Sequence, residues 1–229
     1  MLPRQEIARQ TIVRTKGSIP VIITVAHGGG AKGALFFSEL PVINPAREKN
    51  EGTVFLVWRM LSLLPDSCRP YTLHQGVERP RLTMEMVLDF YDEIILVMEE
   101  VFEKFGRCYL IDIHSFAHQP VFGTYDVIFG TNNRRTIARD FDSQFAAALQ
   151  KAAFLQGVCN GLKIYVPEDA PREGEKFGAT KNMTLVKWVK DREPDVSAIQ
   201  VEIYKDWFIS LEIKVIIAKI FSDAIRMIM

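Results

Sequence analysis

The stretch Pro20-Val21-Ile22-Ile23-Thr24-Val25-Ala26 decides the fold, because it is a continuous β-branched, apolar run without helical spacing. A run of this kind predicts a strand that is buried on both faces, as in a parallel sheet covered by helices. His27 follows the run directly, and Gly28, Gly29 and Gly30 stop the strand. The sequence therefore predicts a buried strand that ends in a histidine.

The segments that follow alternate between helix-like and strand-like patterns. Residues 84–105 have the apolar spacing of a long helix, and Gly106 is a typical stop signal. Such alternation predicts an α/β fold, with residues 1–229 as a single domain around a central, mostly parallel mixed sheet. The other strands are predicted at 12–15 (an edge strand), 71–75, 108–113, 126–129, 162–166 and 197–204, and the other helices at 51–64, 134–155 and 207–229.

Composition narrows the class of protein. The 229 residues are 48% hydrophobic and carry 28 basic and 28 acidic side chains, so the basic excess of a nucleic-acid or anionic-membrane partner is missing. Three scattered cysteines indicate a reducing compartment. The polar N-terminus lacks the apolar core of a signal peptide, and the C-terminal apolar segment holds too many charges for a membrane span. We therefore expect a cytoplasmic protein; its last helix could cover its own core or the second subunit of a homo-oligomer.

Two of the four histidines occupy the position where α/β sheets bind ligands, beyond the carboxyl ends of the strands. His27 ends the first buried strand, and His114 ends the strand predicted at 108–113. If these strands are parallel neighbours, both imidazoles lie at one rim. Gly28 and Gly29 would let the backbone approach a metal or substrate closely. A histidine that merely sits in a turn is the alternative for His27, but a second strand-ending histidine favours one metal-centred hydrolytic site.

Asp112 lies two residues before His114, so the two side chains share a face of the strand. Its carboxylate either orients His114 or is held by N–H groups of a loop, and the sequence favours neither alternative.

Gln200 and Glu202 place two polar groups on one face of an otherwise apolar strand. In a central strand this burial is costly unless the groups are paired or used, whereas an edge strand would leave them in solvent. The functional alternative is a general base that faces an activated water.

These motifs resemble the N-formylglutamate amidohydrolase family, zinc-dependent hydrolases related to the zinc carboxypeptidases. The resemblance rests on residues 26–29, residues 112–116 and residues 200–203, with a weaker match at Glu51-Gly52-Thr53, where a helix opens. It implies a mixed sheet flanked by helices on both faces, of the zinc-exopeptidase or phosphorylase/hydrolase type, with the metal at one rim.

The resemblance also implies roles for individual residues. Zinc would be held by His27, His114 and Glu51, although a carboxylate favoured by the helix dipole is a second explanation of Glu51. Glu202 would be the catalytic base, and Gly28 and Gly29 would contact the substrate. Asp112, Ser115 and Gln200 would surround the ligands and the base.

A carboxylated substrate calls for an arginine, which grips a carboxylate through two parallel hydrogen bonds. The best candidates are Arg79 and Arg81, followed by Arg172 and Lys176 on a polar loop. Family members that act on formylglutamate typically carry Asp-x-Asn-Arg before the long helix, and residues 78–82 are a degenerate version. His74 and His118 receive no role.

Three functions follow from these expectations. The first is a zinc-dependent hydrolase that cleaves an amide bond of a small N-acyl, N-formyl-like amino acid or related carboxylated amide. The second is a carboxypeptidase-like or cell-wall amidase activity at the same site. The third is a non-catalytic, ligand-binding protein of the same fold, which the degenerate arginine motif would favour.

Overall fold

The computed structural model describes residues 12–25, 51–75, 84–118, 123–167 and 184–229, with the side chains of residues 51 and 52 excepted. The strands in this part of the chain are β1 (Ile12–Thr15), β2 (Val21–Val25), β3 (Tyr71–Gln75), β4 (Tyr109–Phe116), β5 (Val127–Gly130), β6 (Ile164–Tyr165) and β7 (Ser197–Tyr204). The helices are α2 (Glu51–Leu63), α3 (Met84–Phe105), α4 (Phe141–Leu155), α5 (Leu185–Lys190) and α6 (Leu211–Ile228), with short 3-10 turns η2 (Asp66–Cys68) and η4 (Lys205–Phe208).

The strands form one seven-stranded sheet in the order β1-β3-β2-β4-β7-β5-β6. The four central strands, β3, β2, β4 and β7, are mutually parallel. At one edge β1 pairs antiparallel with β3, and towards the other β5 pairs antiparallel with β7 and parallel with β6. The predicted α/β fold with a mostly parallel mixed sheet is confirmed, and the carboxyl ends of the four central strands share one rim.

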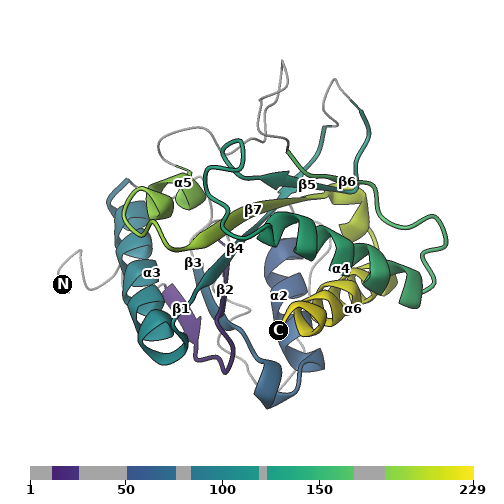
Figure 1. Cartoon of the computed structure of the whole chain (residues 1–229). Coiled ribbons are helices and arrows are strands. Elements are labelled where there is room, and N and C mark those ends of the chain that lie inside the picture. The colour runs from purple at the N-terminus through teal and green to yellow at the C-terminus, as the bar shows by residue number, and fades with distance from the viewer. Residues whose placement is uncertain (1–11, 26–50, 76–83, 119–122, 168–183) are drawn as a thin grey trace, which may run out of the picture.

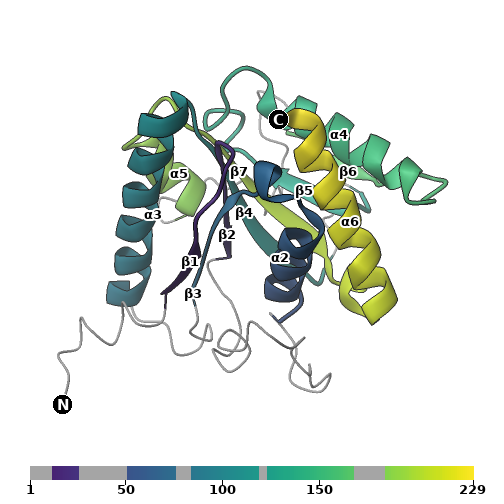
Figure 2. The same cartoon turned by 90° about the horizontal axis from the view of Figure 1, so that it is seen from below.

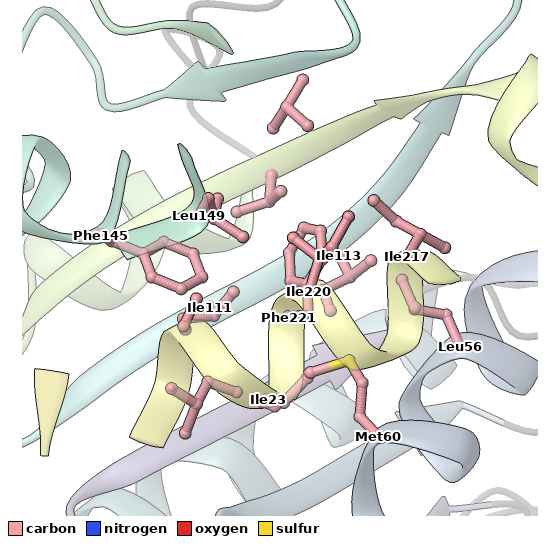
Figure 3. Packing of buried hydrophobic residues seen from close by; sticks show 14 of the residues in the cluster. Ile23, Leu56, Met60, Ile111, Ile113, Phe145, Leu149, Ile217, Ile220 and Phe221 are labelled. Atoms are coloured by element: carbon pink, nitrogen blue, oxygen red, sulfur yellow. The ribbon is translucent and has the colours of Figure 1, made fainter. Parts of the chain in front are cut away.

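Helices cover the sheet on both faces (Figures 1 and 2). Helices α2, α4 and α6 lie on one face, and α3 and α5 lie on the other, with the sheet between the two layers. Figure 3 shows the larger core, in which Ile23, Ile111 and Ile113 of the sheet meet Phe221 of α6 and Phe145 of α4. None of the helices in the described ranges is both long enough and apolar enough to cross a membrane.

Alternation along the central strands fixes which way each side chain faces. Ile111 and Ile113 belong to the core under α2, α4 and α6, whereas Leu110 belongs to the core under α3 and α5. Because successive side chains of a strand point to opposite faces, Asp112 and His114 face the side of α3 and α5. We call this side of the sheet the α3/α5 face.

Several predicted boundaries are wrong. The last helix, predicted at 207–229, begins at Leu211, because residues 205–208 form a 3-10 turn. The helix predicted at 134–155 begins only at Phe141, because left-handed residues precede it. These are Asn132, Asn133 and Arg134, with φ of 48°, 56° and 63°, and Arg139 and Asp140, both with φ of 55°. The loop they form is held against β7 by the Thr136 hydroxyl, which donates to the carbonyl of Ala198 at 2.7 Å.

The strand predicted at 108–113 continues to Phe116, so His114 lies inside β4 instead of following it. The ladder with β7 persists through this segment, pairing His114 with Glu202 and Phe116 with Tyr204. The sequence did not indicate this extension, because polar residues such as those in Asp112-Ile113-His114-Ser115 usually mark the end of a buried strand. Helix α5, with only six residues, was not predicted.

Candidate functional site

The centre of the α3/α5 face carries an unusual set of buried polar side chains. Thr24, Asp112, Gln200 and Glu202 are 0%, 1%, 9% and 7% exposed, and His114 is half-buried beside them. Burial of carboxylates in a central sheet costs free energy unless each is hydrogen-bonded. β7 lies between β4 and β5, so the edge-strand explanation of Gln200 and Glu202 is excluded.

The carboxylate of Asp112 contacts the imidazole of His114. His114 Nε2 lies 2.7 Å from Asp112 Oδ2, and because a carboxylate only accepts, the ring N–H is the donor. Thr24 donates its hydroxyl to Asp112 Oδ1 at 2.8 Å, from the neighbouring strand β2. Both oxygens of Asp112 are therefore engaged, which fixes the carboxylate and, through it, the ring of His114.

Gln200 and Glu202 form a second pair on β7. The amide of Gln200 donates from Nε2 to Glu202 Oε1 at 2.8 Å. In the β4–β7 register Asp112 lies opposite Gln200, and His114 lies opposite Glu202. Neighbouring strands are about 4.8 Å apart, so these four side chains form a compact square with the two carboxylates at opposite corners. The amide of Gln200 and the imidazole of His114 occupy the other two corners.

Tyr91 of α3 is close enough to these residues to sense the charge of Asp112. Its side chain is buried, and its ring centroid lies 5.0 Å from that of Trp188 on α5. Burial, and then the negative charge of Asp112, raise the pKa of the Tyr91 hydroxyl, which stays neutral. Sequence analysis missed Tyr91, since in the helical pattern of residues 84–105 it is one more core position.

His74 lies on β3 but faces the opposite side of the sheet, towards α2. Its ring meets that of Trp58 edge-on at 5.9 Å and borders a small cavity of about 10 Å³ that Val25 and Val54 also line. Burial lowers the pKa of His74 to about 4, so the ring is neutral at pH 7. His118 is exposed, just beyond the end of β4.

Several predicted site residues lie outside the described residues: His27, Gly28, Gly29, Arg79, Arg81, Arg172 and Lys176. Glu51 is the first residue of α2, but its side chain is not described. Ser115 pairs with Ile203 across the ladder, and alternation directs it to the face opposite His114. Its predicted place beside the ligands and the base remains a prediction.

Within the described ranges, no group of three His, Cys, Asp or Glu side chains is close enough to hold a metal ion. The part of the site that the structure brings together is therefore His114 with Asp112, and Glu202 with Gln200. β2 and β4 are parallel neighbours, with Thr24 opposite Asp112, so the strand that precedes His27 runs beside the strand that carries His114. The complete ligand set stays a prediction.

No family model and no curated protein matches the sequence. Among solved structures, the chain is similar to the N-formylglutamate amidohydrolase from Ralstonia eutropha JMP134, with a TM-score of 0.59, 11% identity, and 94% of this chain and 96% of that one covered.

It is also similar to a gene product of Agrobacterium tumefaciens, with a TM-score of 0.54, 14% identity, and 96% and 95% of the two chains covered. At these identities the similarity shows the fold. The chain has the fold of an N-formylglutamate amidohydrolase along almost its whole length, so the resemblance inferred from the short motifs is confirmed at the level of fold.

Proposed function

We propose that this protein is a zinc-dependent hydrolase that cleaves the amide bond of a small N-acyl amino acid or a related carboxylated amide. His27, His114 and Glu51 would hold the metal, and Glu202 would act as the general base. Arg79 and Arg81 would bind the substrate carboxylate, beside Gly28 and Gly29. The fold shared with an N-formylglutamate amidohydrolase supports the reaction type.

One observation carries the proposal: two buried, internally hydrogen-bonded pairs lie side by side, Asp112 with His114 and Gln200 with Glu202. If these residues had only a structural role, apolar residues would stabilise the sheet at least as well, because buried charged groups rarely add stability. Pairs of this type are instead typical of sites where a histidine and a carboxylate must each be held in one orientation.

The donor set fits a zinc ion. Ligating histidines almost always donate their second ring N–H to a carboxylate or carbonyl, as Nε2 of His114 does to Asp112. The tautomer set by this bond leaves Nδ1 as the nitrogen through which His114 would bind the metal. When bound, zinc supplies a Lewis acid that activates water for attack on a carbonyl.

The residues of the chain would then divide the remaining work. Glu202 would take the proton from the attacking water and pass it to the leaving nitrogen as the C–N bond breaks. Gln200 donates to Glu202 Oε1, and this hydrogen bond would hold the carboxylate in one orientation. Asp112 and Thr24 would keep the ring of His114 from rotating.

Metal analysis together with an amide-hydrolysis assay tests this proposal. The purified protein is expected to hold about one zinc ion per chain, and to release free amino acid from N-formyl or N-acetyl amino acids. Chelation should abolish the release, and added zinc should restore it. Short peptides assayed in parallel separate a carboxypeptidase-like activity. A protein that neither retains nor takes up zinc, and leaves every amide intact after zinc is added, would contradict the proposal.

A further inference from the structure

A small aromatic cluster adjoins the candidate site at the rim of the sheet. Its buried members are Phe116 of β4, Ile128 of β5 and Tyr165 of β6, and Tyr125 and Tyr204 pack against them. The cluster is separate from the two large cores, which lie under the helices. It is therefore distinct from the packing that attaches the described helices to the sheet.

The strand register places this cluster directly beside the proposed base. Phe116 and Tyr204 follow His114 and Glu202 by two residues, so they occupy the same face one step nearer the rim. They lie opposite one another in the ladder, with ring centroids 5.3 Å apart. On the other side of β7, Ile128 pairs with Glu202 itself.

Two of the rings are accessible and firmly held. Tyr125 and Tyr204 are half-buried, and the ring of Tyr125 lies 5.4 Å from that of Tyr165. Asp126 connects the segments that carry these two rings. Its carbonyl accepts from the backbone N–H of Tyr204 at 2.8 Å, and its carboxylate accepts from Trp207 Nε1 at 3.1 Å. The same carboxylate accepts from the backbone N–H of Lys163 at 2.7 Å.

A rigid aromatic surface next to a catalytic carboxylate selects ligands by apolar contact, because aromatic rings provide large contact areas and favour other rings. We propose that Tyr125 and Tyr204 bind an aromatic or large apolar group of the substrate, so that the substrate class is an aromatic N-acyl amino acid. This inference rests on the proposed function for the identity of the reacting amide, but the aromatic preference can be measured without turnover.

Sulfonamides provide that test, because they imitate the acyl amide and resist hydrolysis. Calorimetric dissociation constants would be measured for N-methylsulfonyl-glycine, N-methylsulfonyl-phenylalanine and N-benzylsulfonyl-glycine with the zinc-loaded full chain. At least one aromatic probe should bind about tenfold more tightly than the glycine probe. That advantage should disappear in Tyr204→Ala and Tyr125→Ala and persist in Tyr204→Phe, which keeps the ring.

Phe154→Ala is the matched control, since it removes a ring that is 72% exposed on α4, and it should leave the advantage intact. Equal binding of all three probes, failure of all three to bind, or an advantage that survives in both alanine variants would overturn the inference. Hydrolysis of the corresponding amides is assayed separately. Aromatic preference without any hydrolysis would remove the proposed function and leave this inference standing, whereas hydrolysis without aromatic preference would do the reverse.

Discussion

His74 and His114 lie on parallel central strands of the same sheet, yet they occupy opposite chemical environments. His114 is on the α3/α5 face, where Asp112 fixes its ring through a 2.7 Å hydrogen bond. His74 is on the other face, where its ring packs against Trp58 and burial lowers its pKa to about 4. A histidine on a central strand is therefore a candidate ligand when a carboxylate accepts its ring N–H, and a core residue when its ring packs against apolar side chains.

The difference extends to the residues around each histidine. Near His114 lies a second polar pair, Gln200 with Glu202, whereas apolar side chains such as Val25 and Val54 line the cavity beside His74. If this comparison is correct, changes on the α3/α5 face should affect metal binding and turnover. Changes at His74 should affect stability and its dependence on pH.

The largest expected effect is that of Glu202→Gln, which keeps the size of the side chain but removes its capacity to accept a proton. We expect kcat for amide hydrolysis to fall by about 10²–10⁴-fold, with zinc content unchanged. The matched control is Glu103→Gln, an exposed glutamate on α3, which should retain full activity. Undiminished turnover in Glu202→Gln would show that the base is elsewhere.

His74 should make the protein less stable in acid. The unfolded chain takes up a proton at His74 near its ordinary pKa of 6.5, whereas the folded chain does so only near 4. Stability contributed by the neutral ring is therefore present above pH 6.5 and lost as the pH falls from 6.5 to 4, by up to about 3 kcal/mol.

Urea unfolding at pH 7 and pH 4.5 measures this loss. His74→Phe keeps an aromatic ring beside Trp58 but cannot titrate, so the difference between the two pH values should shrink. His118→Ala, which removes an exposed histidine, should leave the difference as in the wild type. An identical pH dependence of the wild type and His74→Phe would refute this explanation.

A smaller effect is expected from Asp112→Asn, which nearly preserves the shape of the side chain but replaces one carboxylate oxygen by an NH2 group. Zinc affinity, measured by competition with a chromophoric chelator, should weaken about 10–100-fold because the tautomer and orientation of His114 are no longer fixed. Asp92→Asn on the exposed side of α3 is the control and should bind zinc as the wild type does. Unaltered zinc affinity in Asp112→Asn would show that Asp112 does not support metal binding and has only a structural role.

Much of the fold could be predicted from the sequence, because its signals are local. The run 20–26 and the helix 84–105 have strong periodicity, and the structure places β2 and α3 there. The predicted helix start at 134 was wrong because the left-handed residues at 132–134 and 139–140 are not visible in an apolar pattern. The six-residue helix α5 is too short for its periodicity to stand out.

The site could be predicted only in part, since side-chain pairs depend on how strands are ordered. The i, i+2 spacing indicated that Asp112 and His114 share a face, and likewise Gln200 and Glu202. It could not reveal that β4 and β7 are neighbours in a register that sets His114 opposite Glu202. Nor could it reveal Tyr91 or the aromatic cluster, because aromatic residues in helices and strands are usually core residues.

Zinc affinity distinguishes the two histidines, because we expect His114 to bind a metal and His74 not to do so. Dissociation constants would be measured by chelator competition for the wild type, His114→Ala, His74→Phe and the exposed control His118→Ala. We expect zinc affinity to fall at least about 100-fold in His114→Ala and to stay within about threefold of the wild type in the other two variants. Wild-type zinc affinity in His114→Ala, or loss of zinc affinity in His74→Phe with the fold intact, would show that the metal is not bound by His114 on the α3/α5 face.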